Sequence, residues 1–346
     1  MCTNEPDFQD FSGYKRTTPG VEIPSKGYLL ILYPVFSIVG NLLVLVMAVK
    51  RSSRMKPPEL LSVNLAVTDL GAAISMYPLA VASAWKHRWL GGDATCVYYA
   101  VAGFFFGIAS IMNLTGLAIV PPAGKTLIKK RRLRLVKLLC LWTWLYALVW
   151  AVFPFVGWGR YGPEPYGLSC SLAWGHMKHE GFSFVVSLFC LNLILPCVII
   201  VFCYFGIAVK LYFTYRTSKS HSNRIPNIIA VLMSLGFVVC WSPYAIVSMW
   251  SILHDSGSIP PEVSLLPCLF AKSSTVYNPL IYYVFSQSFR KEVKQLWLYF
   301  GSALCHVSNG DNATNNDAND DTSVYMVNAH AKTNVQVMST LEEIPE

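Results

Sequence analysis

Long uncharged, apolar runs recur along this chain of 346 residues, and they constrain its fold more than any other feature. A helix needs about 20 consecutive apolar residues to cross the hydrocarbon core of a bilayer. A backbone in lipid must also satisfy its own hydrogen bonds, which a helix does within one segment. We therefore predict an all-α membrane protein, a seven-transmembrane helix bundle built from residues 28–49, 59–84, 96–120, 135–157, 182–213, 226–252 and 262–285.

The composition and the distribution of charge agree with this class. Hydrophobic residues make up 54% of the chain and charged residues 13%, about half the charged share of soluble proteins. The formal net charge is +8, but lysines and arginines gather in alternate connections, at 50–56, 125–134 and 210–224. By the positive-inside rule those connections are cytoplasmic and the N-terminus is extracellular. The cations then face anionic membrane lipid or an acidic protein partner, and we expect no nucleic-acid partner.

The chain divides into three predicted parts. Residues 1–26 form an extracellular tail, residues 27–300 the seven-span domain, and residues 301–346 a cytoplasmic tail whose Asn/Asp-rich sequence predicts disorder. Ser286–Phe300 alternates apolar and basic residues at helical spacing, which predicts a short amphipathic eighth helix on the membrane surface. Cys305 follows directly and is a candidate for palmitoylation, with a free thiol as the alternative.

The other cysteines separate by position along the chain. Cys96 and Cys170 lie at the borders of apolar runs and are the candidates for a disulfide. Small packing residues are predicted inside the runs, at Cys140, Cys190, Cys197, Cys203 and Cys240. CxxC pairs with partnering histidines do not occur, so no metal site is predicted.

One cation, Lys272, lies within the seventh apolar run. A charge at membrane depth is costly, so an intramembrane lysine is a functional hypothesis by default. Two interpretations stay open at this point. In the first, the lysine pairs with an acid or faces a water-filled cavity. In the second, its amine condenses with an aldehyde to give an imine in a dry pocket.

Several short motifs fall in order along the runs. Prolines kink many membrane helices and a buried acid often bonds a neighbouring helix, so each motif alone is weakly specific. The motifs are Gly40-Asn41, Leu65-Ala66-Val67-Thr68-Asp69, Cys240-Trp241-Ser242-Pro243 and Asn278-Pro279-Leu280-Ile281-Tyr282. With these motifs in this order, the chain resembles class A G-protein-coupled receptors over nearly all of residues 28–300.

Within that class, Lys272 resembles the retinal-binding lysine of the opsin family, six residues before Asn278. Tyr99, the Gly-Pro-Glu-Pro loop at 162–165 and the run Ala271–Ser274 are similar to the non-visual neuropsin, peropsin and retinal-isomerase group. The resemblance implies a photoreceptor that binds retinal, 11-cis or all-trans, through Lys272. Photoisomerisation would then switch the helix bundle and signal to a heterotrimeric G protein.

A protonated imine is a buried cation and normally needs an anion. Most opsins of vertebrate vision have an acid three residues past the cysteine that opens the third span, where this chain has Tyr99. Glu164, six residues before Cys170, matches the second-loop counterion of non-visual and invertebrate opsins. The alternative is a solvated loop carboxylate.

The resemblance assigns roles to further residues. It implies a Cys96–Cys170 disulfide that holds the second outer loop over the pocket, with free thiols as the alternative. It places Trp241 and Tyr244, together with Tyr99, in the retinal pocket. The switch residues that it implies are Asp69, Tyr204, Pro243, Asn278, Pro279 and Tyr282.

The sequence departs from the family at the end of the third span. Val120-Pro121-Pro122 stands where the family has Asp/Glu-Arg-Tyr, and two prolines should end the helix early. Three explanations stay open: light sensing without G-protein activation, coupling through the basic run Lys129–Arg134, and an incorrectly joined exon over residues 116–134. The departure also suits a retinal photoisomerase that does not signal, and a peptide or small-molecule receptor without chromophore is a third hypothesis.

Overall fold

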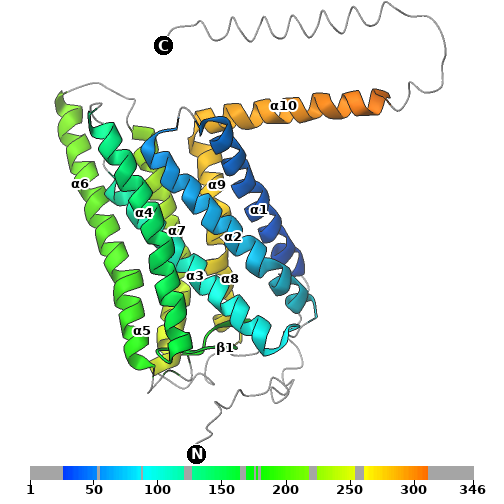
Figure 1. Ribbon diagram of the computed structural model, residues 1–346, viewed down its shortest axis with the longest axis vertical. Helices are drawn as coiled ribbons and strands as arrows, with labels where there is room; N and C mark the ends of the chain where they lie inside the picture. Colours follow the sequence, from blue (N-terminus) through cyan, green and yellow to red (C-terminus); the bar gives the residue numbers. More distant parts are fainter. Residues whose placement is uncertain are drawn as a thin grey trace, which may run out of the picture. The chain divides into compact units, whose positions relative to one another are not determined.

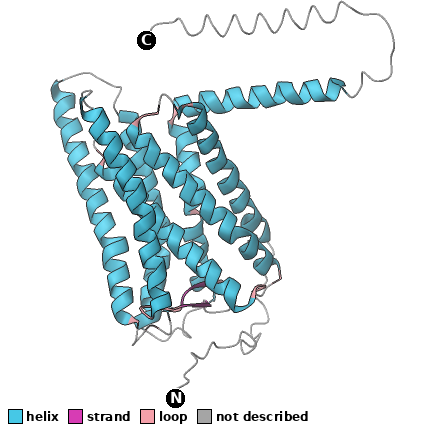
Figure 2. Cartoon of the chain, in the orientation of Figure 1, coloured by secondary structure: helices cyan, strands magenta, loops and turns pink. Residues whose placement is uncertain are grey.

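The predicted runs form helices in a computed structural model of the protein, which describes residues 26–52, 55–86, 89–120, 127–163, 169–174, 177, 181–217, 224–253 and 261–310 (Figures 1 and 2). The helices are α1 (Lys26–Lys50), α2 (Pro57–Trp85), α3 (Gly92–Ile119), α4 (Leu127–Val152), α5 (Phe182–Phe189), α6 (Leu195–Thr217), α7 (Arg224–Leu253), α8 (Pro261–Lys272), α9 (Ser274–Phe285) and α10 (Gln287–Gly310). A 3-10 turn η3 (Phe153–Val156) follows α4, and a π-helical turn η5 (Cys190–Ile194) joins α5 to α6.

The described residues contain six helical segments that are long and apolar enough to cross a membrane. The seventh predicted span is also helical, but it is divided into α8 and α9, each of 12 residues. Neither piece alone has the length of a span, whereas the two in succession cover residues 261–285. The predicted bundle of seven spans is confirmed.

Helix α3 is the centre of the packing. It contacts α2, α4, α6 and α7, while α1 packs against α2 and α9, and α8 packs against α7. The surface that faces lipid is apolar, as at Phe202, which is 72% exposed. Buried polar side chains such as Asn41, Asp69 and Asn113 lie inside the bundle instead. This inversion is expected where lipid tails are as apolar as the side chains that meet them.

Hydrogen bonds between helices involve those buried polar side chains. The amide nitrogen of Asn64 on α2 donates to Asn113 Oδ1 on α3 at 2.6 Å and to Thr143 Oγ1 on α4 at 3.2 Å. Its amide oxygen accepts from the indole nitrogen of Trp144 at 2.9 Å. One side chain thereby joins three helices near the middle of the bundle.

Two short strands lie at one end of the bundle (Figure 2). β1 (Tyr161–Pro163) and β2 (Cys170–Leu172) are antiparallel, and Pro163 pairs with Cys170. The predicted disulfide between Cys96 and Cys170 is present and attaches β2 to the first turns of α3. Burial raises the pKa of the Tyr161 phenol, which donates a hydrogen bond to the Ala151 carbonyl at 3.0 Å.

Two helices extend beyond the predicted runs. Helix α4 begins at Leu127, not at residue 135, because lysine and arginine favour the helix and carry it past the apolar run. Helix α10 ends at Gly310, not at Phe300, so the predicted domain boundary falls inside it. Residues 301–308 contain no proline that would stop a helix. The Cys305 side chain and the predicted disordered tail from residue 311 lie outside the described residues.

The chain separates into two compact units, Met1–Glu292 and Val293–Glu346. The first contains all of α1 to α9 and both strands. The second contains most of α10, whose alternation of apolar and basic residues is typical of a helix on a membrane surface.

Breaking the disulfide should destabilise the bundle. Cys96→Ser together with Cys170→Ser removes a link between residues 74 positions apart, which the chain-entropy relation values at roughly 4 kcal/mol. We expect a clearly lower midpoint of thermal unfolding for the purified protein in detergent. Cys197→Ser, at a half-buried free cysteine, is the control and should leave the midpoint nearly unchanged. An unchanged midpoint in the double variant would contradict a structural role for the disulfide.

Candidate functional site

A cavity of about 180 Å³ lies between α2, α3, η5, α7, α8 and strand β2. Its walls are mainly apolar and aromatic, with contributions from Phe104, Phe106, Trp174, Phe237 and Trp241. Such a cavity with a few convergent polar groups is the usual form of a site for a small apolar ligand.

Lys272 lines this cavity because the helix breaks directly after it. The Ser273 N–H donates to the carbonyls of both Leu269 and Phe270, and the next helix starts at Ser274. The Val276 N–H donates to Ser273 at 3.0 Å and so is not the partner of the Lys272 carbonyl. That carbonyl instead accepts from the Tyr77 hydroxyl at 2.7 Å and from the Thr275 hydroxyl at 3.3 Å. A side chain of α2 thus compensates for the hydrogen bond that the break removes.

The same backbone position is fastened to α1. The Thr275 hydroxyl lies 2.7 Å from the Tyr77 hydroxyl and accepts a hydrogen bond from Ser37 at 2.9 Å. The amide of Asn41 donates to the Thr275 carbonyl at 2.9 Å. Helices α1 and α2 therefore fix the backbone that carries Lys272.

Three of the described residues lie close to the Lys272 amine. It donates to Ser169 Oγ and to Cys268 Sγ, each at 3.1 Å, and it lies 5.0 Å from the centre of the Tyr99 ring. Ser169 directly precedes Cys170, so the disulfide-bonded strand delivers this hydroxyl to the lysine. Among the described residues, the groups closest to the amine are neutral polar atoms and one aromatic face.

Trp241 and Tyr244 line the cavity from α7, and Tyr99 lines it from α3. The Trp241 indole stacks on Phe237, with centres 5.4 Å apart, and its nitrogen donates to Ser274 Oγ at 3.2 Å. On α3 the residue facing it is Gly107, where an added Cβ would lie 2.9 Å from the indole. The Tyr244 hydroxyl accepts from the Trp174 nitrogen at 3.2 Å.

Glu164 falls within residues 164–168, outside the described part of the chain. By sequence it directly follows Pro163, the residue that pairs with Cys170. Among the described residues that line the cavity, none is an aspartate or a glutamate.

The predicted switch residues form two further groups in the bundle. Asp69 is buried and accepts from the Asn278 amide at 2.7 Å and from Ser110 Oγ at 3.3 Å, which joins α2, α9 and α3. The hydroxyls of Tyr204 on α6 and Ser234 on α7 lie 3.1 Å apart.

The remaining switch residues take up defined packing positions. Tyr204 and Tyr282 pack against one apolar cluster, made of Leu65, Ile111, Leu114, Ala118, Ile200, Ile229, Met233 and Phe237. Pro243 lies inside α7, and an added Cβ at Gly40 of α1 would lie 2.7 Å from the Pro279 ring. The structure therefore places α1 against the middle of α9, where Pro279 lies.

Helix α3 ends at Ile119, as the two prolines predict. Val120 has the extended backbone that precedes a proline, with φ −69° and ψ 116°. Its buried side chain packs with Leu61 and Val136.

Four described residues that bond to the lysine amine or carbonyl are missing from the sequence-based site: Ser169, Cys268, Tyr77 and Thr275. Cys268 stands four residues before Lys272, and this spacing on one helix face is a signal that could have identified it. Ser169 is adjacent to a predicted disulfide cysteine. Nothing in the sequence pairs Tyr77 with the carbonyl of residue 272.

Known proteins resemble this chain in sequence and in fold. Residues 40–282 match the model of the 7 transmembrane receptor (rhodopsin family). Opsin-5 of Mus musculus is 35% identical over 279 residues, which is 76% of this chain and 74% of that protein. The visual pigment-like receptor peropsin of Homo sapiens is 33% identical over 276 residues, covering 76% and 81%.

A solved structure agrees at the level of the fold. The crystal structure of squid rhodopsin superposes with a TM-score of 0.69 at 24% identity, over 85% of this chain and 91% of that one. Taken with the matched family model and the relatives above 30% identity, the chain belongs to the rhodopsin family of seven-transmembrane receptors and, within it, to the non-visual opsins.

Proposed function

We propose that this multi-pass membrane protein is a light sensor that binds retinal covalently through Lys272. The observation that carries the proposal is the position of the Lys272 amine in the wall of an apolar cavity, under a strand that is held by a disulfide. A primary amine in a dry apolar site is the group that condenses with an aldehyde. The opsin relatives support the same choice of ligand.

The residues that are present fit an elongated apolar aldehyde. Phe104, Phe106 and Trp241 supply aromatic walls, and Lys272 supplies the attachment point. When bound, retinal supplies a polyene that isomerises on absorbing light. The protein's part is to hold the Lys272 backbone in place through Tyr77, to exclude water with β2, and to balance the charge on the lysine nitrogen.

Glu164 is our candidate for the anion that balances this charge. Its sequence position next to Pro163 and the absence of an acid among the described cavity residues support the choice. Tyr99 lies beside the amine as a neutral neighbour and offers an aromatic face. Such a face attracts a cation more weakly than a carboxylate does.

For the switch, we propose that α7 moves outward around Pro243. Trp241 contacts both Phe237 and Ser274 within the cavity wall, so a change in ligand shape would act first on this side chain. The remaining switch residues would pass the change on through α2, α6 and α9; they are Asp69, Tyr204, Asn278, Pro279 and Tyr282. The ligand would thereby bias two states of one bundle.

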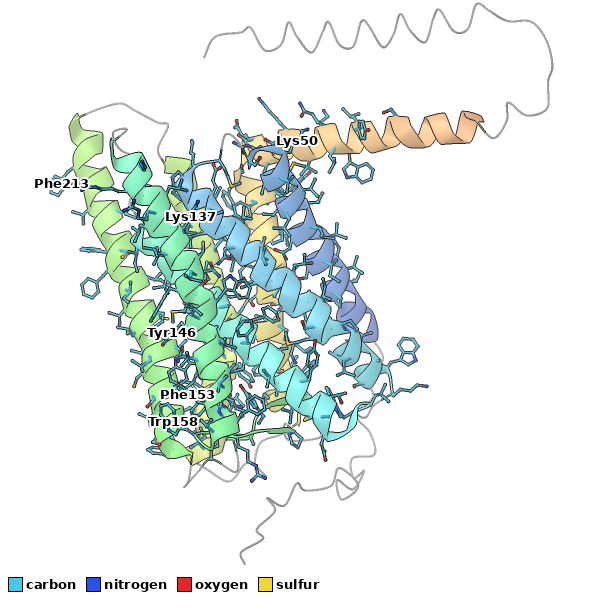
Figure 3. All side chains as sticks on the ribbon, viewed as in Figure 1. Lys50, Lys137, Tyr146, Phe153, Trp158 and Phe213 are labelled. Atoms are coloured by element: carbon cyan, nitrogen blue, oxygen red, sulfur yellow. A yellow bond between two sulfur atoms is a disulfide. The ribbon has the colours of Figure 1, made fainter. Side chains whose placement is uncertain are left out.

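The orientation that we propose has the strands outside the cell and the opposite end in the cytoplasm. Disulfides form in oxidising compartments, which supports an outer position for Cys96 and Cys170. Phe153 and Trp158 lie toward one end of the bundle, and Lys50 and Lys137 lie toward the opposite end (Figure 3). A basic cytoplasmic end suits anionic lipid and a heterotrimeric G protein as partners.

A second candidate function is retinal photoisomerisation without signalling. The early end of α3 at Ile119 favours it, because the family's arginine is missing there. In that case Lys272 would bind all-trans retinal and release the 11-cis form.

The lysine can be tested by absorption spectroscopy. Purified protein incubated with 11-cis retinal should gain a light-sensitive absorption band at a longer wavelength than the band of free retinal. Lys272→Ala should lose this band completely because no amine remains for the linkage. Lys291→Ala, a lysine on α10, is the control and should keep the band. A folded wild-type protein that acquires no band would contradict the proposal.

The counterion can be tested on the same pigment. Glu164→Gln should lower the pKa of the Lys272 nitrogen, since a nearby anion stabilises its charged form. At neutral pH the visible band should then move to the ultraviolet and return as the pH is lowered. Glu164→Asp should keep the visible band. Removing a nearby opposite charge shifts a pKa by about 1 to 3 units, so spectra recorded from about pH 5 to 9 would reveal such a change. A Glu164→Gln pigment whose spectrum is unaltered over this range would show that Glu164 is not the counterion.

The end of α3 discriminates the two functions. Val120→Asp, Pro121→Arg and Pro122→Tyr together remove two helix-breaking residues, each worth about 3 kcal/mol inside a helix, and supply an arginine. We expect this triple variant to increase light-dependent nucleotide exchange on purified heterotrimeric G proteins. A Pro121→Ala, Pro122→Ala double variant is the control that restores helix without arginine. If wild type and triple variant are equally silent, while the wild type turns over more than one retinal per protein, photoisomerisation is the function.

A further inference from the structure

Asn192 places in the cavity wall a side-chain amide that makes no hydrogen bond to any described residue. Its side chain is 8% exposed and lines the same cavity as Lys272. Neither Nδ2 nor Oδ1 has a hydrogen-bond partner among the residues that the structure describes. Burying an amide without hydrogen-bond partners in apolar surroundings costs folding free energy comparable to that of a lost hydrogen bond. Its presence here therefore points to a ligand group that pairs with it.

The local backbone explains why this side chain is at the wall. Pro196 stands four residues after Asn192, so it supplies no N–H to the Asn192 carbonyl and crowds it with its ring. The turn widens into the π-helix η5, in which the Leu195 N–H bonds to Cys190 five residues back. Such a turn holds an extra residue and re-aims the side chains within it. Phe189 and Leu193, on either side of Asn192, line the same cavity.

Asn192 and Lys272 approach the cavity from different sides. η5 packs against α3 and continues α5 and α6, whereas α8 packs against α7 and α9. A ligand that is attached to Lys272 and fills the cavity therefore presents its far end to the wall that contains Asn192. For retinal that far end is the ring.

We propose that Asn192 selects a retinoid whose ring carries a hydroxyl group. The inference rests on the proposed function and adds the chemical class of its ligand. An amide has both donor and acceptor atoms, and a hydroxyl both accepts from Nδ2 and donates to Oδ1. A hydrocarbon ring satisfies neither atom. Phe189 and Leu193 beside it have no polar side-chain atoms, so the amide is the group in this part of the wall that a ring hydroxyl meets.

The test is a competition for the full-length apoprotein. An equimolar mixture of 11-cis retinal and 11-cis 3-hydroxyretinal is added in excess, and the bound retinoids are extracted as oximes and quantified by chromatography. A site built to hydrogen-bond a hydroxyl should favour the hydroxylated form by about tenfold or more over its analogue. Asn192→Leu, which keeps the size and removes the amide, should bring the ratio close to one. Leu188→Met, a volume-conserving change on the same wall, is the control and should retain the preference.

Each outcome decides the inference. Preference in the wild type that disappears in Asn192→Leu and persists in Leu188→Met supports it. Equal uptake of the two retinoids by the wild type overturns it and leaves the proposed function standing, and this result needs no variant to fold. A preference that survives in Asn192→Leu also overturns it. Failure to bind either retinoid, by a protein that is folded, overturns the proposed function and this inference with it.

Discussion

A polar group inside a bilayer has to find its hydrogen-bond partner within the protein, and the bundle is arranged by this requirement. The amide of Asn64 on α2 hydrogen-bonds to α3 and α4, and Asp69 on α2 accepts hydrogen bonds from α9 and α3. The break after Lys272 obeys the same rule, since the Tyr77 hydroxyl replaces the missing helix donor at 2.7 Å. The Thr275 hydroxyl gives the same carbonyl a second, longer hydrogen bond at 3.3 Å. The position of the functional amine therefore depends on a side chain of another helix.

The irregular parts of the backbone gather around the cavity. The α8–α9 break carries Lys272, the π turn carries Asn192, and strand β2 brings Ser169 to the amine. Regular helices fix the surrounding frame, in which Gly107 lets Trp241 approach α3 closely. A ligand that changes shape inside such a frame would act first on these irregular parts of the backbone. This favours the cavity, and not the lipid-facing surface, as the origin of any conformational switch.

The sequence predicted the bundle, the disulfide and the lysine, because each depends on local composition or on a motif of fixed order. Apolar runs fix the spans, and Lys272 is conspicuous as a cation in one of them. The break at Ser273 and the contact of Cys268 with the amine follow from three-dimensional packing, which one-dimensional periodicity does not encode. The π turn was missed although its cause, Pro196, is visible. A proline in a membrane helix predicts a disturbance but not its form, which neighbouring helices decide.

The end of α3 separates binding from signalling in physical terms. Everything that holds a chromophore lies in or beside the cavity: Lys272, Trp241 and the disulfide-bonded strand. Val120 lies far along α3 from Cys96, and its side chain packs with Leu61 and Val136 of the neighbouring helices. The α3 residues that line the cavity lie between Tyr99 and Ile111, so all of them precede the end of the helix at Ile119. Under the function that we propose, photochemistry depends on Lys272, whereas coupling to a G protein would depend on the residues at this end of α3.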